Sequence, residues 1–289
     1  MTHSSSRLFD ALCEPANLDA AYRRLSTAGG LWRRGVPMFK MRHQPVRHML
    51  ELARDLVARR YQPDVPRAFE IEKGDGTRRT LHAYSVRDRI VQRAALHVLQ
   101  PAGERLFLDF SYGFRPGLTV DMAVSRVREF VRAGYHWLVD GDIRRCFDAI
   151  PRPRVVKLVQ AVAGDREFVR LISAWLSTAP TLNARGEACG LPQGMVLSPF
   201  LCNLYLHGFD LALRRADIPA VRYADDFVML ARSQRDAHAA RGFARERLAG
   251  AGLELHPDKT RVIKSARTHA FLGRRLPEAT AFGRSLQCC

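Results

Sequence analysis

Two adjacent aspartates, Asp225 and Asp226, lie between short apolar runs in the stretch VRYADDFVMLARS, residues 221–233. Neighbouring carboxylates repel each other, so a hairpin that carries them needs a compensating charge or exposure at the tip of its turn. A solvated turn is the simplest explanation for such a pair taken alone. A bound metal ion is the alternative, and it requires further carboxylates nearby.

A second acidic segment, LVDGDIRRCFDAI at residues 138–150, supplies Asp140, Asp142 and Asp148. Side chains alternate between the two faces of a strand, so Asp140 and Asp142 are expected to point the same way. If one of them lies at a strand end beside the aspartate hairpin, three carboxylates converge. Mg²⁺ prefers such oxygen ligands, and two ions together stabilise the attacking and leaving oxygens of a phosphoryl transfer. This pattern is typical of a nucleotidyltransferase.

Between the two acidic segments lies GLPQGMVLSPFLCNLYL, residues 190–206. Gly190, Pro192 and Gly194 predict a bent backbone that side chains do not obstruct. A flat ligand such as a base pair can then lie against the main chain, and Gln193 can donate and accept hydrogen bonds there. An ordinary loop at a helix entry explains the same residues.

The charge of the chain indicates a polyanionic partner, since the formal net charge at pH 7 is +17. Nucleic acid is the first candidate and an acidic membrane the second. No apolar run approaches the roughly 18 to 20 residues of a membrane span, which removes most support for the membrane. The six cysteines show no paired C-x-x-C spacing, so no zinc site is indicated. Scattered cysteines and a polar N-terminal stretch favour the cytoplasm.

The periodicity of the chain mixes helices with hairpins, so we expect an α+β fold. Residues 46–57 and 86–100 have helical spacing, the second helix ending at Pro101, and a hairpin with an Asp-Gly turn lies between them. Further helices are expected around residues 123–133, 151–164, 166–179, 198–216 and 233–252, with Ser233 as a cap. Strands are expected at 136–143, on each side of Asp225 and Asp226, and over 253–263 and 269–276.

Seven sequence blocks follow one another in an order that resembles the reverse transcriptases of the group II intron-encoded type and their bacterial relatives. They are EIEKGDGTRRTLHAYSVRDRIVQRAALHVLQP, DFSYGFRPGLTVDMAVSRVRE, DIRRCFDAI, LPQGMVLSP, YADD, GLELHPDKT and FLG. The resemblance covers roughly residues 60 to 275. It implies the fingers and palm of a right-handed polymerase, with an antiparallel palm sheet backed by helices.

The resemblance also implies roles for single residues. Asp142, Asp225 and Asp226 match the carboxylates that bind two Mg²⁺ ions, with Mn²⁺ as a substitute, and Lys259 matches a lysine proposed to protonate the leaving pyrophosphate. An ammonium can release a proton, whereas a guanidinium holds it too tightly. A plain surface lysine is the alternative for Lys259.

The substrate-binding residues implied by the resemblance lie in several blocks. Lys73 and Arg79 match the residues that hold the incoming triphosphate, and Gln193 matches the residue near the nucleotide sugar. Phe147 matches the aromatic ring that crowds a ribose 2′-OH and favours deoxynucleotides, although a core phenylalanine is the competing interpretation. Tyr223 and Gly194 are expected along the primer and template.

The expected domains are an N-terminal extension (1–45), a fingers and palm domain (46–275) and a short C-terminal tail (276–289). The fingers are expected at about 46–130 and 152–188, and the palm at about 131–151 and 189–275. Cys146 stands where the family usually has Phe, and Arg79-Thr80-Leu81 where it has Arg-Pro-Leu. No thumb, maturase or endonuclease segment fits in the tail, so the thumb is expected to be absent or vestigial.

The expected function is RNA-directed DNA polymerisation, with an RNA template, a DNA or RNA primer and deoxynucleotides as partners. A partner protein or a structured RNA is expected to take the place of the thumb. The alternative is a non-catalytic or truncated RNA-binding relic that acts as a scaffold or as a defence or CRISPR-associated component. RNA-to-RNA copying is disfavoured by Phe147 and by Tyr-Ala-Asp-Asp in place of Gly-Asp-Asp.

Overall fold

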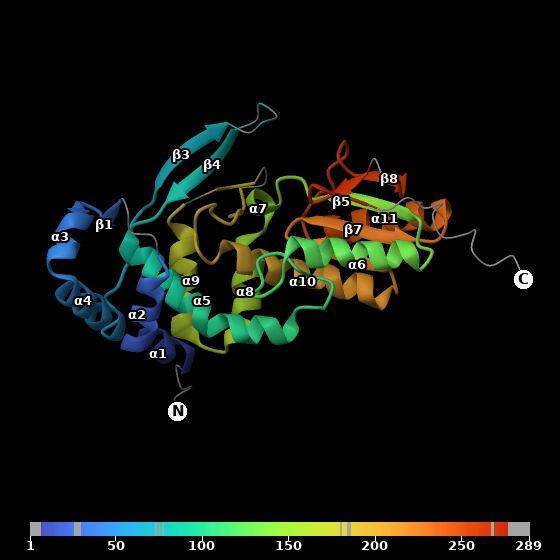
Figure 1. Ribbon diagram of the computed structural model, residues 1–289. Coiled ribbons are helices and arrows are strands. Elements are labelled where there is room, and N and C mark those ends of the chain that lie inside the picture. Colours follow the sequence, from blue (N-terminus) through green and yellow to red (C-terminus); the bar gives the residue numbers. More distant parts are fainter. Residues whose placement is uncertain are drawn as a thin grey trace, which may run out of the picture. The chain divides into compact units, whose positions relative to one another are not determined.

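The computed structural model describes residues 7–25, 30–72, 74, 76, 78–179, 181–183, 186–266 and 269–276 (Figure 1). Helices and antiparallel hairpins alternate along these residues, which confirms the α+β class. The chain divides into two compact units. Unit 1 comprises Met1–Arg105 and Ile150–Leu201, and unit 2 comprises Leu106–Ala149 and Cys202–Cys289. The expected limits of fingers, palm and N-terminal extension stay predictions, and the expected tail lies, except for Leu276, outside the described residues.

Unit 1 is largely helical in the part that the structure describes. Its elements are α1 (Arg7–Cys13), α2 (Pro15–Arg23), β1 (Leu31–Arg33), β2 (Val36–Pro37), α3 (Met38–His43), α4 (Pro45–Val57), β3 (Arg67–Glu72), β4 (Arg78–Ala83), α5 (Val86–Leu106), α8 (Arg152–Ala163) and α9 (Arg166–Ser177).

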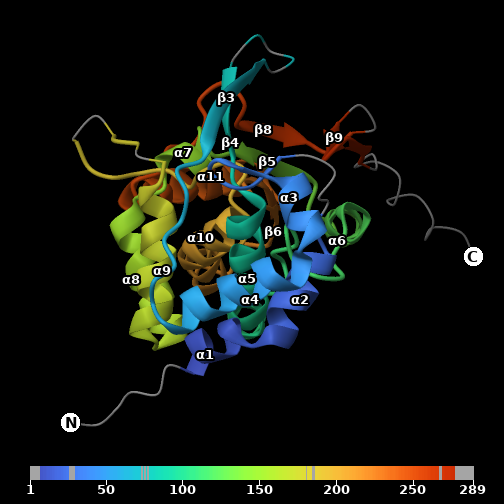
Figure 2. The same ribbon diagram turned by 90° about the vertical axis from the view of Figure 1, so that its left-hand side faces the viewer.

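Helices α8 and α9 lie side by side (Figure 2). The Asp165 carboxylate caps α9 by accepting from Phe168 N at 3.1 Å, and its other oxygen accepts from Phe9 N in α1 at 2.9 Å. Phe168, Ile172 and Trp175 of α9 are fully buried. One buried aspartate therefore fixes the start of α9 and the place of α1 together.

The expected hairpin before α5 is present as β3 and β4, with Phe69 opposite Leu81. Most of its side chains are exposed, Phe69 and Ile71 among them. At its base, His82 N donates to the carbonyl of Gln193 at 2.7 Å. A Cβ at Gly194 would lie 2.2 Å from the His82 carbonyl oxygen, and Gly194 has φ +108°. Only glycine fits this close approach.

The predicted end of α5 at Pro101 is wrong, because the helix runs through this proline to Leu106. Proline removes one backbone hydrogen bond and crowds the preceding turn. Leu99 and Gly103, on either side of it, are both buried. The apolar contacts of this buried stretch offset the lost hydrogen bond, so tertiary packing overrides the local signal.

Unit 2 contains a four-stranded antiparallel sheet. Its elements are α6 (Val120–Arg132), β5 (Trp137–Asp142), α7 (Cys146–Ala149), α10 (Ser198–Arg215, which begins in unit 1), β6 (Ala220–Tyr223), β7 (Asp226–Ala231), α11 (Gln234–Gly250), β8 (Arg261–Lys264), β9 (Ala270–Phe271) and β10 (Arg274–Arg275). The strand order is β6-β7-β5-β8, while β9 and β10 form a separate hairpin.

The two faces of the sheet carry different side chains. Leu138 of β5 lies opposite Leu230 of β7, and both pack in one apolar cluster with Val124 and Val127 of α6. Figure 1 shows α6 lying along the sheet. The alternate positions of β5 point to the other face, where a Cβ at Gly141 would lie 2.4 Å from the Phe227 ring. The glycine between Asp140 and Asp142 thus lets an aromatic ring cross the strand.

Helix α11 follows the sheet and is capped as expected, because the Ser233 hydroxyl accepts from Asp236 N at 3.1 Å. Of the closing strands, β8 begins only at Arg261. The expected strand over 253–263 is therefore wrong in its first half. Residues 254–260 instead form a loop that bonds to the end of β5, with Arg144 N donating to Glu254 O and His256 N donating to Asp142 O, both at 2.8 Å.

No helix in the described stretches has both the length and the apolar character required to cross a lipid bilayer.

Candidate active site

The strand register brings two of the predicted carboxylates together, since Asp142 at the end of β5 pairs with Asp226 at the start of β7. Residues directly opposite in an antiparallel pair point to the same face, with Cβ atoms about 4.5–5.5 Å apart, and like charges in this position are destabilising. Asp140 shares this face because it lies two residues before Asp142. Asp225 is the next residue to Asp226 and completes the acidic group.

Crowding of these carboxylates changes the acidity of Asp226. Partial burial and, after it, the charges of Asp225, Asp142 and Asp140 raise the pKa of Asp226 to about 6, while Lys259 lowers it. The Asp226 side chain is open to solvent on one side. Burial is the main cause that raises the pKa of Asp140, and the charge of Asp142 raises it further. The positive charge of Arg261 acts in the opposite direction.

The turn that carries the aspartate pair is short and strained. Tyr223 pairs with Asp226, so only Ala224 and Asp225 connect β6 to β7. Ala224 has φ +59°, a left-handed conformation that side chains with a Cβ rarely adopt. Such strain costs on the order of 1–3 kcal/mol and persists only where surrounding contacts impose it.

Those contacts come from Arg222, which is fully buried. Its Nε and Nη2 donate to the two carboxylate oxygens of Asp210 on α10, at 2.7 and 2.5 Å. Nη1 donates to Asn203 Oδ1 and to the carbonyl of Ala224, both at 2.8 Å, and Nη2 also donates to Ser111 Oγ at 2.7 Å. All five N–H donors of the guanidinium are therefore satisfied.

Gly113 holds the same turn from a third segment. A Cβ at this position would lie 2.3 Å from Ala224 N, so the backbone approaches the turn more closely than any other residue permits. The Gly113 carbonyl accepts from Asn203 Nδ2 at 2.7 Å. Sequence reasoning missed this network. Two sequence features could have predicted it: a charged residue, Asp210, within the apolar helix 198–216, and an arginine directly before Tyr223.

Lys259 lies beside the carboxylates, with Nζ 3.5 Å from Asp142 Oδ2. The loop 254–260 places it there through the bonds to the end of β5 and through Thr260, which is buried. The lysine side chain is 58% exposed and that of Asp142 is 23% exposed, so the pair is open on the lysine side. Proximity to the carboxylates distinguishes Lys259 from an isolated surface lysine.

The donor set fits a magnesium site that substrate completes. Among the residues described, no group of three or more His, Cys, Asp or Glu side chains is arranged so that it could itself hold a metal ion. Mg²⁺, however, is usually held by one or two carboxylates together with substrate phosphates. The opposed pair Asp142 and Asp226 supplies two carboxylates whose mutual repulsion a cation would relieve. The assignment of Asp142, Asp225 and Asp226 as metal ligands stays a prediction.

Phe147 is half-buried and lies on the short helix α7, five residues after Asp142. Its ring meets that of Phe114 edge to face, with centroids 6.3 Å apart, and Phe114 is itself 50% exposed at φ +60°. Phe147 is thus not a fully buried core residue, which favours the gate interpretation. The neighbouring Cys146 is buried, with its Sγ 3.9 Å from that of Cys202.

The remaining predicted residues belong to unit 1. Arg79 is exposed on β4, and Lys73 lies outside the described residues. Gln193 and Gly194 lie at the bend before α10, where the close approach of His82 is by itself sufficient to require glycine at 194. The roles predicted for these four residues in nucleotide and template binding stay predictions.

Residues 71–276 match the family described as reverse transcriptase (RNA-dependent DNA polymerase). The chain belongs to the reverse transcriptase family. The resemblance inferred from the sequence blocks is thereby confirmed, together with the fingers and palm fold and the enzymatic class of nucleotidyltransferases.

Two relatives show the extent of the similarity. Protein YkfC of Escherichia coli (strain K12) is 32% identical over 271 residues, covering 78% of this chain and 71% of that protein. Group II intron-encoded protein LtrA of Lactococcus lactis subsp. cremoris is 29% identical over 211 residues, covering 71% of this chain but 35% of LtrA.

A solved structure of apo telomerase from Candida tropicalis, truncated from its C-terminal domain, is similar with a TM-score of 0.53. The sequence identity is 13%, over 72% of this chain and 52% of that one. This similarity shows a shared fold.

The Arg222–Asp210 pair predicts a large stability effect. Asp210→Ala is expected to lower the free energy of unfolding by about 3–5 kcal/mol, because it leaves the buried Arg222 charge without its counterion. Asp109→Ala is the matched control, since it removes the partner of Arg214 from an exposed pair with side chains 54% and 76% accessible. That change is expected to cost about 0–1 kcal/mol. Chemical denaturation measures both, and equal losses would contradict the role of the buried pair.

Asp226 predicts a pH-dependent effect. Its folded-state pKa of about 6 exceeds the ordinary 3.8, so the folded state binds more protons between these values and stability falls as pH rises through that window. In metal-free protein, Asp226→Asn is therefore expected to stabilise by about 1 kcal/mol above pH 6, after discounting for solvent screening, and very little near pH 4.

Thermal unfolding across pH 4 to about 8 measures this difference. The control is Asp258→Asn, an exposed aspartate in the loop that carries Lys259. A pH-independent effect of Asp226→Asn, or the same profile from Asp258→Asn, would show that the carboxylate crowding is not felt in solution.

Proposed function

We propose that this chain is an RNA-directed DNA polymerase that transfers deoxynucleotides to a primer 3′-OH on an RNA template. The observation that carries the proposal is the register pairing of Asp142 with Asp226, beside Asp225 on a turn held from beneath. Two carboxylates fixed opposite each other repel and cost free energy, which exposed surface carboxylates without a function would avoid. In a site that binds divalent cations and phosphates, the cations offset this repulsion.

Asp142, Asp225 and Asp226 would hold two Mg²⁺ ions, which supply charge neutralisation for the phosphates and activation of the primer hydroxyl. The 3′-oxygen attacks the α-phosphate of the deoxynucleotide, the bond from that phosphorus to the bridging oxygen breaks, and pyrophosphate leaves. The fixed carboxylates orient this in-line geometry without reorganisation during the reaction. Lys259, whose Nζ lies 3.5 Å from Asp142 Oδ2, would donate a proton toward the pyrophosphate.

Binding of the template and primer follows from charge and shape. The net charge of +17 attracts a polyanion, and its affinity is expected to fall as salt rises. Reverse transcriptases read the geometry of the duplex through its backbone more than through its bases, as expected for A-form helices. Tyr223 borders the carboxylates because it pairs with Asp226, which suits a residue beneath the primer end.

Primer extension tests the proposal directly. With an RNA template, a DNA primer, Mg²⁺ and labelled deoxynucleotides, the double variant Asp225→Asn and Asp226→Asn is expected to lose about a hundred- to a thousandfold in extension rate. Asp258→Asn should extend at the wild-type rate. Absence of extension by the wild type at low salt, or equal rates from wild type and double variant, would favour a non-catalytic RNA-binding scaffold.

Phe147 gives a separate prediction about sugar selection. Phe147→Ala is expected to raise the use of ribonucleotides relative to deoxynucleotides by about 10- to 100-fold, since a steric gate discriminates by roughly 1–3 kcal/mol. The ratio of kcat/KM for the two nucleotide types measures it. Phe114→Ala is the control, because it removes the neighbouring ring of the edge-to-face pair and leaves Phe147 in place. An unchanged ratio in Phe147→Ala would remove the gate assignment and leave the polymerase proposal intact.

A further inference from the structure

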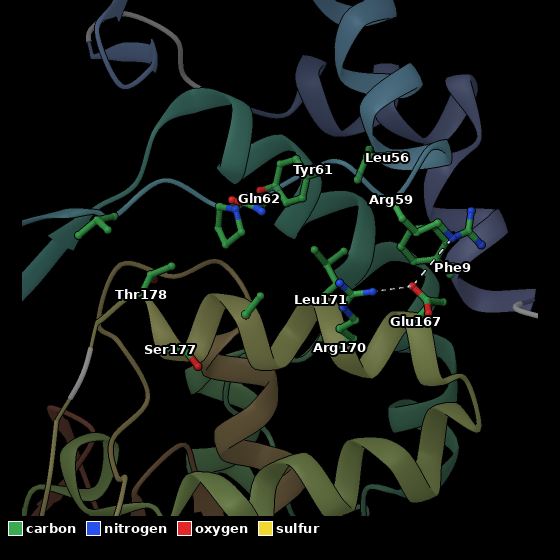
Figure 3. Close-up of a pocket in the computed structure, with 13 residues that line it drawn as sticks. Phe9, Leu56, Arg59, Tyr61, Gln62, Glu167, Arg170, Leu171, Ser177 and Thr178 are labelled. Carbon is green, nitrogen blue, oxygen red and sulfur yellow. Dashed lines mark ion pairs between the residues drawn. The ribbon is translucent and has the colours of Figure 1, made fainter.

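A pocket of about 490 Å³ lies in unit 1, outside every residue assigned above to polymerisation. One wall is a single face of α9, on which Figure 3 shows Glu167 and Arg170. Ala174 lines the pocket from the same helix. The opposite wall is the segment 59–65 that follows α4, and Phe9 of α1 closes one end. This size falls within the range of small-ligand pockets, roughly 300–1,000 Å³.

Two guanidinium groups share one carboxylate in this pocket. Arg59 Nε lies 3.9 Å and Arg170 Nη1 lies 3.8 Å from Glu167 Oε2 (Figure 3). These separations exceed hydrogen-bond length, so both arginines retain donors for a further acceptor. The Arg59 guanidinium also lies over the Phe9 ring, 4.6 Å from its centroid, which fixes the plane of the group.

The walls of the pocket are held in place before any ligand binds. Arg59 has φ +56°, and its Nη1 donates to the Val57 carbonyl at 2.7 Å. Tyr61 OH donates to Asp88 on α5 at 2.6 Å and accepts from Trp175 Nε1 on α9 at 3.1 Å. Tyr61 of one wall is thus bonded to α9, which forms the other wall, and to α5. A preformed pocket avoids the free-energy cost of ordering on binding.

A second hollow adjoins the pocket, and together they form a groove. It has a volume of about 460 Å³, shares Val65 with the first, and carries Arg34, Arg67 and one carboxylate, Asp64. Val65 is 68% exposed, and Leu31 of the second hollow is 46% exposed. Apolar surface interleaved with arginines therefore follows the segment 59–67.

We propose that this groove binds single-stranded RNA and that the first pocket takes one unstacked nucleotide. The base lies against Leu171, Ala174 and Val65, and Glu167 accepts from a base N–H group. Arg59 and Arg170 bind the flanking phosphates. Arginines repeated along a groove favour a polymer of regular negative charge over a peptide, and the net charge of +17 agrees. This site is distinct from the carboxylates that the proposed polymerase uses.

Fluorescence anisotropy with a short labelled single-stranded RNA tests the site in the full chain over a range of salt. Ala174→Phe fills the pocket and is expected to weaken RNA binding about tenfold with an unchanged salt dependence, since the base loses its apolar pocket while no charge is removed. Arg170→Gln is expected to reduce the slope of log affinity against log salt by about 0.7, as for one phosphate contact. Arg170 is 74% exposed, so its replacement leaves folding intact.

Arg166→Gln is the matched control, because Arg166 is exposed on the same helix and does not line the pocket. It is expected to bind RNA as the wild type does. Equal RNA affinity of Ala174→Phe and wild type, or equal salt slopes for Arg166→Gln and Arg170→Gln, would overturn the proposal. Binding of an acidic peptide that Ala174→Phe abolishes, with RNA affinity unchanged, would assign the groove to a protein instead.

The outcome is independent of the polymerase proposal. Extension of a saturating primed template is expected to be unaffected by Ala174→Phe. When Ala174→Phe is added to the double variant Asp225→Asn and Asp226→Asn, RNA binding is expected to weaken by the same factor as in the wild type. Loss of extension in Ala174→Phe would also overturn the assignment, because the pocket would then serve polymerisation itself.

Discussion

Electrostatic repulsion between Asp142 and Asp226 is the constraint around which unit 2 is organised. The strand register fixes the two carboxylates opposite each other, and β5 is paired on both sides, with β7 and β8, so neither can move away. Lys259 offsets part of the negative charge from a loop bonded to the end of β5. The remainder is available to cations and to the phosphates they carry, which is the condition that phosphoryl transfer requires.

The rigidity that this repulsion demands comes from the opposite face of the hairpin. Arg222 alternates with Tyr223 along β6, so its side chain points away from the carboxylates and into the core beside α10. There it joins Asp210, Asn203, Ser111 and the Ala224 carbonyl in one network. A buried ion pair is weak evidence for stability as such. Its contribution here is to hold a strained turn in a single conformation.

Much of this organisation was accessible from sequence. The helix of residues 46–57, the hairpin before α5, the Ser233 cap and the strands around Asp142 and Asp226 follow from periodicity and turn chemistry, which are local properties. Pro101 was misread because burial on both sides of it is not visible locally. Arg222 and Gly113 were missed because their partners lie far away in the chain, and charge and size alone do not reveal which residues will face each other.

The two-residue turn between Tyr223 and Asp226 makes chain length, and not only residue identity, a property of the site. One residue added to or removed from this turn would shift β7 by one position against β6 and transfer every following side chain to the opposite face. After a deletion Phe227 would lie opposite Asp142, and after an insertion the residue before Asp226 would; in both cases the Asp226 carboxylate would turn toward α10. A substitution in this hairpin can change the geometry of the carboxylates by degrees. An insertion or a deletion separates the opposed pair completely. Length variation in related chains is therefore expected to be confined to segments outside residues 220–231.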